Sequence, residues 1–370
     1  MRIAVLVSND LVHDQRVRKT CDVMVRKGWE PTLIGRLLPD SKPISRPYET
    51  HRISGMPKAG ARFYAHLQWE LWRFLKRRTD FDAIWANDLD TLWPAWHVAQ
   101  SRNLPIVYDS HEYFLGAAGL TNRPFPQWVW RQIEARIFPK LTHAITVNEH
   151  IAQLYRQQYG VDVKVVRNVP ELLPHPEPAT RAEFNLPEGK LAILQGAFMD
   201  RDRGVLEAVA AMDLLPDVNL LLVGAGEEWD EARRRSSARS AKNHIICLPK
   251  QEYNRLRQLT RLADVGLSLD KPVHENYQFS LPNKLFDYLH AGVPVVASNV
   301  PEVAKVVRAF GVGELTASVT PDAIAAAIHK VIDNGADHYS ANISKAAEAF
   351  NWQKESTTIE AILDSIAGEL

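Results

Sequence analysis

The sequence predicts an α/β protein made of two doubly wound domains, each a parallel sheet with helices on both faces. Three observations lead to this fold class. The chain has 370 residues, which is more than one hydrophobic core usually supports. Short β-branched runs alternate with longer amphipathic segments, as in βαβ units. A polar stretch at 171–190 with four prolines interrupts this alternation, which then resumes.

The first half of the chain shows this alternation from its start. The opening segment reads MRIAVLVSNDLVHDQ, a short apolar run followed by polar residues, so it is a buried strand rather than a signal peptide. A helix is expected over 16–28, where a glycine ends it. The predicted strands of this half are 2–8, 31–35, 50–54, 83–87, 106–110, 144–148 and 163–167.

The second half repeats the pattern after the proline-rich stretch. Its predicted strands are 191–197, 219–224, 245–248, 265–269 and 294–298. We expect a first domain over 1–175, a linker over 176–190, a second domain over 191–350, and a closing helix over 351–370 that packs back on the first domain. We expect the two domains to face a central cleft. Ligands of doubly wound sheets bind beyond the carboxyl ends of the strands, so the loops after the strands are where site residues are expected.

Composition narrows the classes of function. Lys and Arg together number 44, as do Asp and Glu, and this balance argues against nucleic acid as a partner. Cys21 and Cys247 lie far apart, and no CxxC or Cys/His cluster occurs, so neither structural zinc nor a disulfide framework is expected. No apolar run approaches the roughly 20 residues that span a bilayer. We expect a cytoplasmic protein that meets the inner face of the cell membrane, if at all, from its surface.

A cation occupies the first turn of a predicted helix, where acidic residues are normally favoured. The segment 280–298 reads SLPNKLFDYLHAGVPVVAS, in which Ser280 can cap the helix and Pro282 suits its first turn. A phosphate bound there would receive backbone N–H groups and the ammonium of Lys284. Asp287 follows on the same helical face, and its carboxylate suits the two hydroxyls of a ribose. The segment predicts a nucleoside diphosphate site, with a surface Lys/Asp ion pair as the alternative.

A second basic segment follows a predicted strand. Residues 195–204 read QGAFMDRDRG and precede a helix expected over 205–212. Arg201 and Arg203 therefore lie on a loop at the carboxyl end of a strand, where guanidinium groups match the geometry of phosphate. Solvated loop arginines are the alternative interpretation.

These segments resemble the family 4 glycosyltransferases. Further stretches that carry the resemblance are LLLVGAGEE, AFNWQKE, HDQRVRKTCDVMVRKGWEPTLIG, LPIVYDSHEYF and VVRNVP, so it covers nearly the whole chain. The resemblance implies the GT-B fold and transfer of a sugar from a nucleotide-diphosphate sugar with retention, without a metal ion or a further cofactor. It also implies a carbohydrate or lipid-linked acceptor in envelope polysaccharide or glycoconjugate synthesis.

The resemblance assigns residues on the donor side. Arg203 and Lys284 would hold the diphosphate, and Asp287 would take the ribose hydroxyls. Phe279 occupies the position of the family's first acidic residue, eight residues before Asp287, and Glu275 is the expected substitute. The remaining donor-side candidates are Arg201, Ser280 and Leu281.

In the first domain, His111 in the segment DSHE matches the family's active-site histidine. Asp109 and Glu112 flank it and would tune its protonation. Asn87 in WANDLD takes the place of a second histidine often found after the preceding strand. The acceptor-side candidates are Asn9, Asp10, Asn87 and Asp88.

Three short patterns bear on other classes of function. DLD at 88–90 and DRD at 200–202 resemble the DxD of metal-dependent transferases, but Asp88 and Asp90 suit a helix start. GAG at 224–226 lacks the third glycine of a dinucleotide fingerprint, because Trp229 stands there. The open alternatives are a nucleotide-sugar epimerase of similar fold, which would release a sugar without an acceptor, and a non-catalytic transferase-like scaffold, which would bind no nucleotide sugar.

Two segments of the first half combine apolar and basic residues at helical spacing. They are YAHLQWELWRFLKRR at 64–78, with Leu67, Leu71 and Phe74 before the cluster Lys76, Arg77 and Arg78, and PQWVWRQIEARIFPK at 126–140, with Trp128, Trp130, Ile133 and Ile137 among Arg131, Arg136 and Lys140. Helices of this kind can lie in the headgroup region of a membrane, which predicts peripheral contact. Packing of their apolar residues against the sheet is the alternative.

Overall fold

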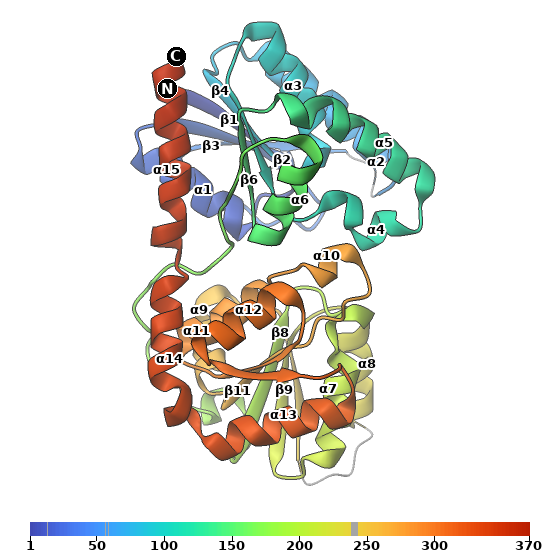
Figure 1. The fold of residues 1–370 in the computed structure, drawn as a ribbon, viewed down its shortest axis with the longest axis vertical. Helices are drawn as coiled ribbons and strands as arrows, with labels where there is room; N and C mark the ends of the chain where they lie inside the picture. Colours follow the sequence, from blue (N-terminus) through green and yellow to red (C-terminus); the bar gives the residue numbers. More distant parts are fainter. Residues whose placement is uncertain (13, 56, 58, 238–242) are drawn as a thin grey trace. The chain divides into compact units, whose positions relative to one another are not determined.

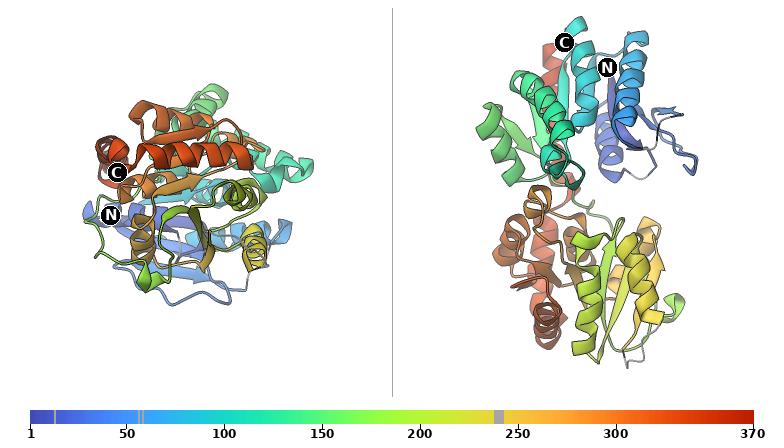
Figure 2. Two further views of the ribbon diagram at one scale, coloured as in Figure 1. Left: turned by 90° about the horizontal axis from the view of Figure 1, so that it is seen from below. Right: turned by 90° about the vertical axis from the view of Figure 1, so that its right-hand side faces the viewer.

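A computed structural model describes residues 1–12, 14–55, 57, 59–237 and 243–370. The chain forms two compact units, each with its own core (Figures 1 and 2). The first unit consists of Met1–Asn168 and Lys354–Leu370, and the second of Val169–Gln353. The second unit begins before residue 175, the predicted domain end, because the proline-rich stretch already packs on it: Arg257 donates a hydrogen bond to the carbonyl oxygen of Pro174 at 2.7 Å.

The first unit is built on a seven-stranded parallel sheet with the order β3-β2-β1-β4-β5-β6-β7. Its strands are β1 (Arg2–Asp10), β2 (Glu30–Arg36), β3 (Glu49–Ile53), β4 (Ala83–Asn87), β5 (Ile106–Ser110), β6 (His143–Thr146) and β7 (Val163–Val165). The central strands β4 and β5 are buried along their whole length, as parallel strands covered on both faces should be. Their register places Asn87 beside Asp109 at the carboxyl ends.

Helices cover both faces of this sheet (Figure 1). They are α1 (Gln15–Arg26), α2 (Ala61–Arg77), α3 (Leu89–Arg102), α4 (Ala118–Thr121), α5 (Pro124–Ile137) and α6 (Glu149–Tyr159), with short 3-10 turns at Phe114–Gly116 and Phe138–Lys140. No helix in the described part of the chain combines the length and the apolar character that crossing a bilayer requires.

The apolar stripes of α2 and α5 belong to the core of the first unit. Leu67 and Leu71 are fully buried there, and Phe74 packs against the same cluster. Trp130 and Ile137 of α5 are buried as well. These buried residues therefore face the sheet, as the alternative interpretation expects, whereas Trp128 of the predicted α5 stripe is exposed.

The last helix, α15 (Trp352–Glu369), runs along the first unit beside α1 (Figure 1). Ile359 and Leu363 are fully buried. The ammonium of Lys27, at the end of α1, lies 2.7 Å from a carboxylate oxygen of Asp364. Both ends of the chain lie at the same end of this unit (Figures 1 and 2).

The second unit contains a six-stranded parallel sheet with the order β10-β9-β8-β11-β12-β13. Its strands are β8 (Lys190–Gly196), β9 (Val218–Gly224), β10 (Ile245–Pro249), β11 (Val265–Ser268), β12 (Val295–Ser298) and β13 (Gly313–Thr316). Its helices are α7 (Val205–Ala211), α8 (Glu227–Ser237), α9 (Tyr253–Arg261), α10 (Glu275–Gln278), α11 (Asn283–Ala291), α12 (Pro301–Phe310), α13 (Pro321–Asn334) and α14 (Ala336–Ala349), with 3-10 turns at Ala182–Phe184, Arg201–Arg203 and Met212–Leu214.

The edge strand β13 was not predicted. It has four residues, GELT, of which three are only partly buried, so it lacks the apolar run typical of a buried parallel strand. Its first residue must be glycine, because a Cβ on Gly313 would collide with the carbonyl oxygen of Val295 in β12.

In both sheets the strand order reverses between two central strands. The reversal lies between β1 and β4 in the first unit and between β8 and β11 in the second. Loops that leave such neighbouring strands turn to opposite faces of the sheet and open a crevice at their carboxyl ends, where ligands bind. These two switch points locate the candidate site residues of each unit.

Candidate functional site

Two loops meet at the β8/β11 switch of the second unit. The backbone N–H of Lys271 donates to the carbonyl oxygen of Asp202 at 2.8 Å, and its ammonium donates to that of Arg201 at 2.6 Å. Gly204 has a φ of 68°, and a Cβ there would lie 2.6 Å from the Cβ of Leu269. Glycine is needed at this position because the first loop turns tightly against the end of β11.

Three charged side chains converge where these loops meet. Asp270 is 1% exposed, and its Oδ1 accepts hydrogen bonds from Arg203 Nη1 at 2.9 Å and from Lys284 Nζ at 3.3 Å. Burial opposes the charge of Asp270, but Lys284 and Arg203 outweigh burial and hold the pKa of this carboxyl below its usual value. Burial lowers the pKa of Lys284, and Asp270 opposes that shift. The cation at the helix start is thus balanced by a buried carboxylate of the chain itself.

Helix α10 contacts the same loop through Tyr277. The guanidinium carbon of Arg203 lies over the ring of Tyr277, 4.5 Å from its centroid, a cation–π contact. Glu275, the expected substitute for the missing family acid, is exposed on α10. The side chain of Arg201, the other predicted phosphate contact, is also exposed.

The start of α11 differs in one respect from the prediction. The N-cap residue is Pro282, which offers no side-chain cap, and the hydroxyl of Ser280 donates instead to the carbonyl oxygen of Tyr277 at 3.0 Å. Ser280 is therefore not the helix cap, because its side chain is used to close the preceding turn. Leu281 packs partly against the core. Asp287 is half-buried one turn further on and accepts a 3.3 Å hydrogen bond from Gln195 in β8.

The first unit carries a second cluster, centred on His111. Its Nδ1 lies 3.4 Å from Asp88 Oδ2, and its Nε2 lies 3.2 Å from Asn87 Oδ1 and 3.6 Å from Asp109 Oδ2. Burial disfavours the imidazolium, but Asp88 and Asp109 outweigh burial and raise the pKa of His111 to about 9. His111 is therefore positively charged at neutral pH, held between two carboxylates.

Arg16 completes this cluster, although the sequence analysis did not identify it. Its guanidinium grips Asp109 with Nη2–Oδ1 and Nε–Oδ2 distances of 2.6 and 3.3 Å, and its Nη1 donates to the carbonyl oxygen of Val166 at 2.7 Å. Burial would raise the pKa of Asp109, but Arg16 and His111 lower it to about 2. A signal was present in the sequence, because Arg16 is a cation in the first turn of α1, as Lys284 is in α11.

Asp88 has a strained backbone, with a φ of 60° and a ψ of 165°, which costs about 1–3 kcal/mol for a residue other than glycine. Its N–H donates to the carbonyl oxygen of Asp109 at 2.9 Å, and its Oδ1 accepts from the N–H of His111 at 2.8 Å. Asp88 precedes α3 but makes no side-chain cap. The predicted capping role is therefore wrong for Asp88, whose carboxylate turns to His111 instead.

A further carboxyl, Asp90, lies in the first turn of α3 and is 5% exposed. Burial and then the charge of Asp88 raise the pKa of Asp90 to about 7, and Glu112 adds to this shift. Glu112 itself is half-buried. The acidic groups around His111 therefore carry fewer negative charges at neutral pH than their number suggests.

Two of the predicted acceptor-side residues have structural partners. Asn9 donates to Asp14, the N-cap of α1, at 3.3 Å. Asp10 accepts a hydrogen bond from Arg52 at 2.7 Å. Within the described residues, the hydrogen bonds found for Asn9 and Asp10 do not join them to the His111 cluster. Asn87 and Asp88 are the two acceptor-side candidates that the structure brings beside His111.

The outer faces of α2 and α5 expose aromatic side chains. Phe125 and Trp128 are 71% and 55% exposed and stack with ring centroids 6.2 Å apart. Trp69 on α2 is 57% exposed and stacks on Trp72. Arg131 and other exposed basic residues stand on the same helices. Trp128 was expected here, whereas Trp69 and Phe125 were not.

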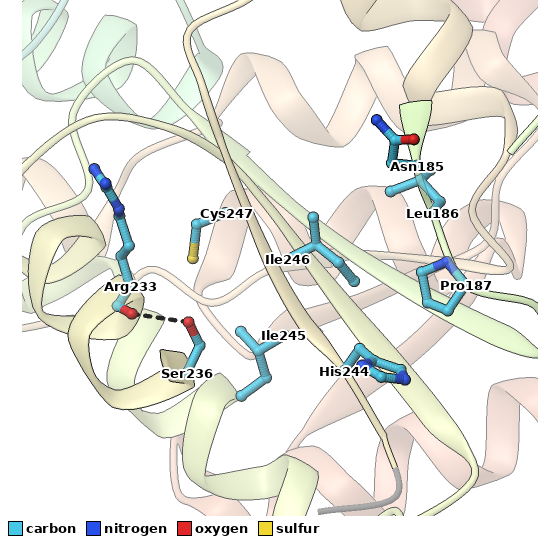
Figure 3. Close-up of a pocket in the computed structure, with 9 residues that line it drawn as sticks. All are labelled: Asn185, Leu186, Pro187, Arg233, Ser236, His244, Ile245, Ile246 and Cys247. Atoms are coloured by element: carbon cyan, nitrogen blue, oxygen red, sulfur yellow. Dashed lines mark hydrogen bonds between the residues drawn. The ribbon is translucent and has the colours of Figure 1, made fainter. Parts of the chain in front are cut away.

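A surface pocket of about 500 Å³ lies at the edge strand β10 (Figure 3). Arg233 and Ser236 of α8 stand on one side of it and the segment Asn185–Pro187 on another (Figure 3). Burial raises the pKa of the Cys247 thiol that lines it, so this thiol is a poor nucleophile. None of the predicted site residues lines the pocket.

Two models of known protein families match this chain. The model for "Glycosyltransferase Family 4" matches residues 15–170, and the model for "Glycosyl transferases group 1" matches residues 176–350. The chain belongs to the family 4 glycosyltransferases. The family expectation from the sequence is therefore confirmed.

Individual relatives of this glycosyltransferase are distant. A phosphatidyl-myo-inositol mannosyltransferase of Mycobacterium leprae is 27% identical over 214 residues, 56% of this chain and 52% of that protein. A glycogen synthase of Mycobacterium tuberculosis is 24% identical over 310 residues, 78% of this chain and 70% of that protein. The match to the mannosyltransferase thus spans about half of that relative's length.

Solved structures confirm the GT-B fold. Sucrose-phosphate synthase from Thermosynechococcus elongatus superimposes with a TM-score of 0.79 at 20% identity, covering 100% of both chains. An Anabaena protein, HepE, solved in complex with UDP-glucose, matches with a TM-score of 0.72 at 16% identity over 99% of this chain and 100% of that chain. At these identities the likeness shows the fold.

Proposed function

We propose that this glycosyltransferase moves a sugar from a nucleotide-diphosphate sugar to a hydroxyl of a carbohydrate or lipid-linked acceptor, with retention and without a metal ion. The observation that carries the proposal is the pair of cations, Arg203 and Lys284, at the β8/β11 switch of the second unit. Two fixed positive charges beside a helix start match the two phosphates of such a donor. The HepE structure with UDP-glucose, which has the same fold, supports a nucleotide sugar as the ligand.

The departing diphosphate gains negative charge as the bond from the anomeric carbon to the phosphate oxygen breaks. Arg203, Lys284 and the N-terminus of α11 would stabilise that charge from positions set before the reaction begins, so little reorganisation is needed. The acceptor oxygen forms the new bond on the face that the diphosphate leaves, and its proton passes to the leaving phosphate. Asp287 would hold the ribose hydroxyls during these steps.

The first unit would supply His111. As an imidazolium whose two ring nitrogens face Asp88, Asn87 and Asp109, it would offer a positive charge to the donor sugar and its leaving group. Arg16 and Asn87 would keep the ring in this orientation through Asp109 and by direct contact. The acceptor would lie near Asn87 and Asp88.

A thermal-shift screen with UDP-, GDP- and ADP-sugars tests the proposal directly. We expect one nucleotide class to raise the melting temperature, because a donor at a hundred times its Kd adds about 2.7 kcal/mol to the free energy of unfolding. The donor that binds is then incubated with and without candidate acceptors, and products are separated by mass spectrometry.

Each outcome of this screen discriminates between functions. Transfer that requires an acceptor supports the proposal. Release of an epimerised sugar without an acceptor would identify an epimerase instead. Absence of stabilisation by every nucleotide sugar would indicate a non-catalytic scaffold and contradict the proposal.

We further propose that the protein is cytoplasmic and acts at the inner face of the cell membrane on an envelope acceptor, with the exposed aromatic faces of α2 and α5 as the contact. Trp69, Phe125 and Trp128 offer apolar area, and neighbouring basic residues such as Arg131 complement anionic headgroups. Exposed aromatic and basic residues on one helix are typical of interfacial helices. Each basic residue near an anionic surface contributes about 1 kcal/mol.

Liposome flotation checks this contact. The wild type should float with anionic vesicles at low salt and sediment at high salt. The double variant F125S/W128S should lose most of this binding, because both side chains are exposed and their removal leaves the core intact. F198S, which removes an equally exposed aromatic residue from the second unit, is the matched control and should float normally. A wild type that stays in the soluble fraction with anionic vesicles at low salt would exclude the membrane and favour a soluble acceptor.

A further inference from the structure

A single carboxylate oxygen links the two cations of the proposed donor site. Asp270 Oδ1 accepts from Arg203 Nη1 at 2.9 Å and from Lys284 Nζ at 3.3 Å. The side chain of Asp270 is 1% exposed, that of Lys284 11% and that of Arg203 27%. Asp270 Oδ2 is buried and has no hydrogen-bond partner among the described residues. Among the described residues, the side-chain hydrogen bonds of Asp270 therefore go to these two cations.

We infer that Asp270 is a positioning residue, which holds Arg203 and Lys284 side by side at the spacing that receives a diphosphate. This inference rests on the proposed function, because it assigns a role within the same donor site. Asp270 was not among the residues predicted from the sequence. The three residues come from three elements: the 3-10 turn Arg201–Arg203, the loop after β11, and α11.

The physical argument starts from repulsion. Two partly buried cations that share one partner within 3.3 Å would repel each other strongly if that partner were neutral. Asp270 removes most of this repulsion and gives both side chains one anchor point. The three groups together carry one net positive charge, so the site still attracts a dianionic phosphate group.

Asp270 also keeps Lys284 charged. Burial and Arg203 lower the pKa of Lys284, and Asp270 is the group that raises it. Arg203 in turn faces Asp270, Tyr277 and Asp200. Neutralising Asp270 should therefore lower the pKa of Lys284 further. The ammonium would then be lost at a lower pH, and diphosphate binding with it.

The test measures binding of UDP, GDP and ADP by calorimetry across pH 6–10 for the wild type, D270N and D270E. D270N keeps the shape but removes the charge, and D270E keeps the charge but moves it by one methylene group. We expect both variants to bind the nucleotide at least tenfold more weakly than the wild type at pH 7, as loss of one charge-assisted contact would cause. Binding by D270N should also fade at a lower pH than binding by the wild type, whereas D270E should keep the wild-type pH limit.

D264N is the matched control, because Asp264 also joins an arginine and a lysine, Arg181 and Lys190, within the same unit. It should bind the nucleotide as the wild type does. If D270N or D270E binds as tightly as the wild type or more tightly, with an unchanged pH limit, Asp270 does not position the cations and the inference is overturned. If the wild type itself binds none of the three nucleotides, the proposed function fails, and the inference fails with it. Where D270N does not fold, as judged by circular dichroism, D270E decides.

Discussion

The H111A variant should transfer sugar about a hundred- to a thousandfold more slowly than the wild type while binding the donor nucleotide with nearly unchanged affinity. The magnitude is that of removing one preorganised electrostatic contact from an active site. The affinity is preserved because His111 belongs to the first unit, whereas Arg203 and Lys284, which would grip the nucleotide, belong to the second. Initial rates per folded molecule and the Kd of the nucleotide are the two measurements.

The charge on His111 adds a pH signature to this prediction. Asp88 and Asp109 overcome the effect of burial and raise the pKa of His111 to about 9, so the imidazolium is present below that pH and is lost above it. The wild-type rate should fall as the pH rises through about 9, and the small residual rate of H111A should lack this step. H97A, which removes an exposed histidine of the same unit, serves as the control. A purely structural role for His111 would appear as a much lower melting temperature with normal turnover per folded molecule.

Replacing either Arg203 or Lys284 by alanine should weaken binding of the nucleotide diphosphate about ten- to a hundredfold. A hydrogen bond between charged groups contributes about 1.5–3 kcal/mol, and each tenfold change in Kd corresponds to about 1.4 kcal/mol. The double variant should lose less than the product of the two single effects, because both side chains share Asp270 Oδ1 and each single change disturbs the other cation. Calorimetry with the nucleotide found by the donor screen measures all three.

The control for this pair is K330A, which removes a mostly exposed lysine paired with Glu314, away from the β8/β11 switch. It should leave the Kd unchanged. Unaltered affinity in both R203A and K284A would show that the donor nucleotide does not bind at the β8/β11 switch. Loss of affinity in only one would show that the other cation serves the structure alone.

The sequence was sufficient for the architecture, because that depends on local patterns. Nearly every predicted strand is present, and β4 and β5 have the predicted bounds, since buried parallel strands are short apolar runs between helical segments. The edge strand β13 was missed in the prediction because half-exposed strands carry no such apolar run. The apolar stripes of α2 and α5 were seen, but a helix that packs on a sheet and a helix that lies on a membrane can share the same spacing.

The same distinction between local patterns and tertiary packing applies to the candidate site. By itself, the sequence determined which residues are chemically unusual: Lys284 at a helix start, Arg203 on a strand-end loop, and His111 among acids. Only the tertiary structure decided which carboxylates neutralise these positive charges, because the partners are distant in the chain. Asp270 lies 67 residues from Arg203, and Asp109 lies 93 residues from Arg16. Such pairs form only when parallel strands bring their carboxyl ends to one edge of a sheet, so the counter-ions of both clusters, and the strained Asp88 beside His111, are properties of the fold rather than of any local segment.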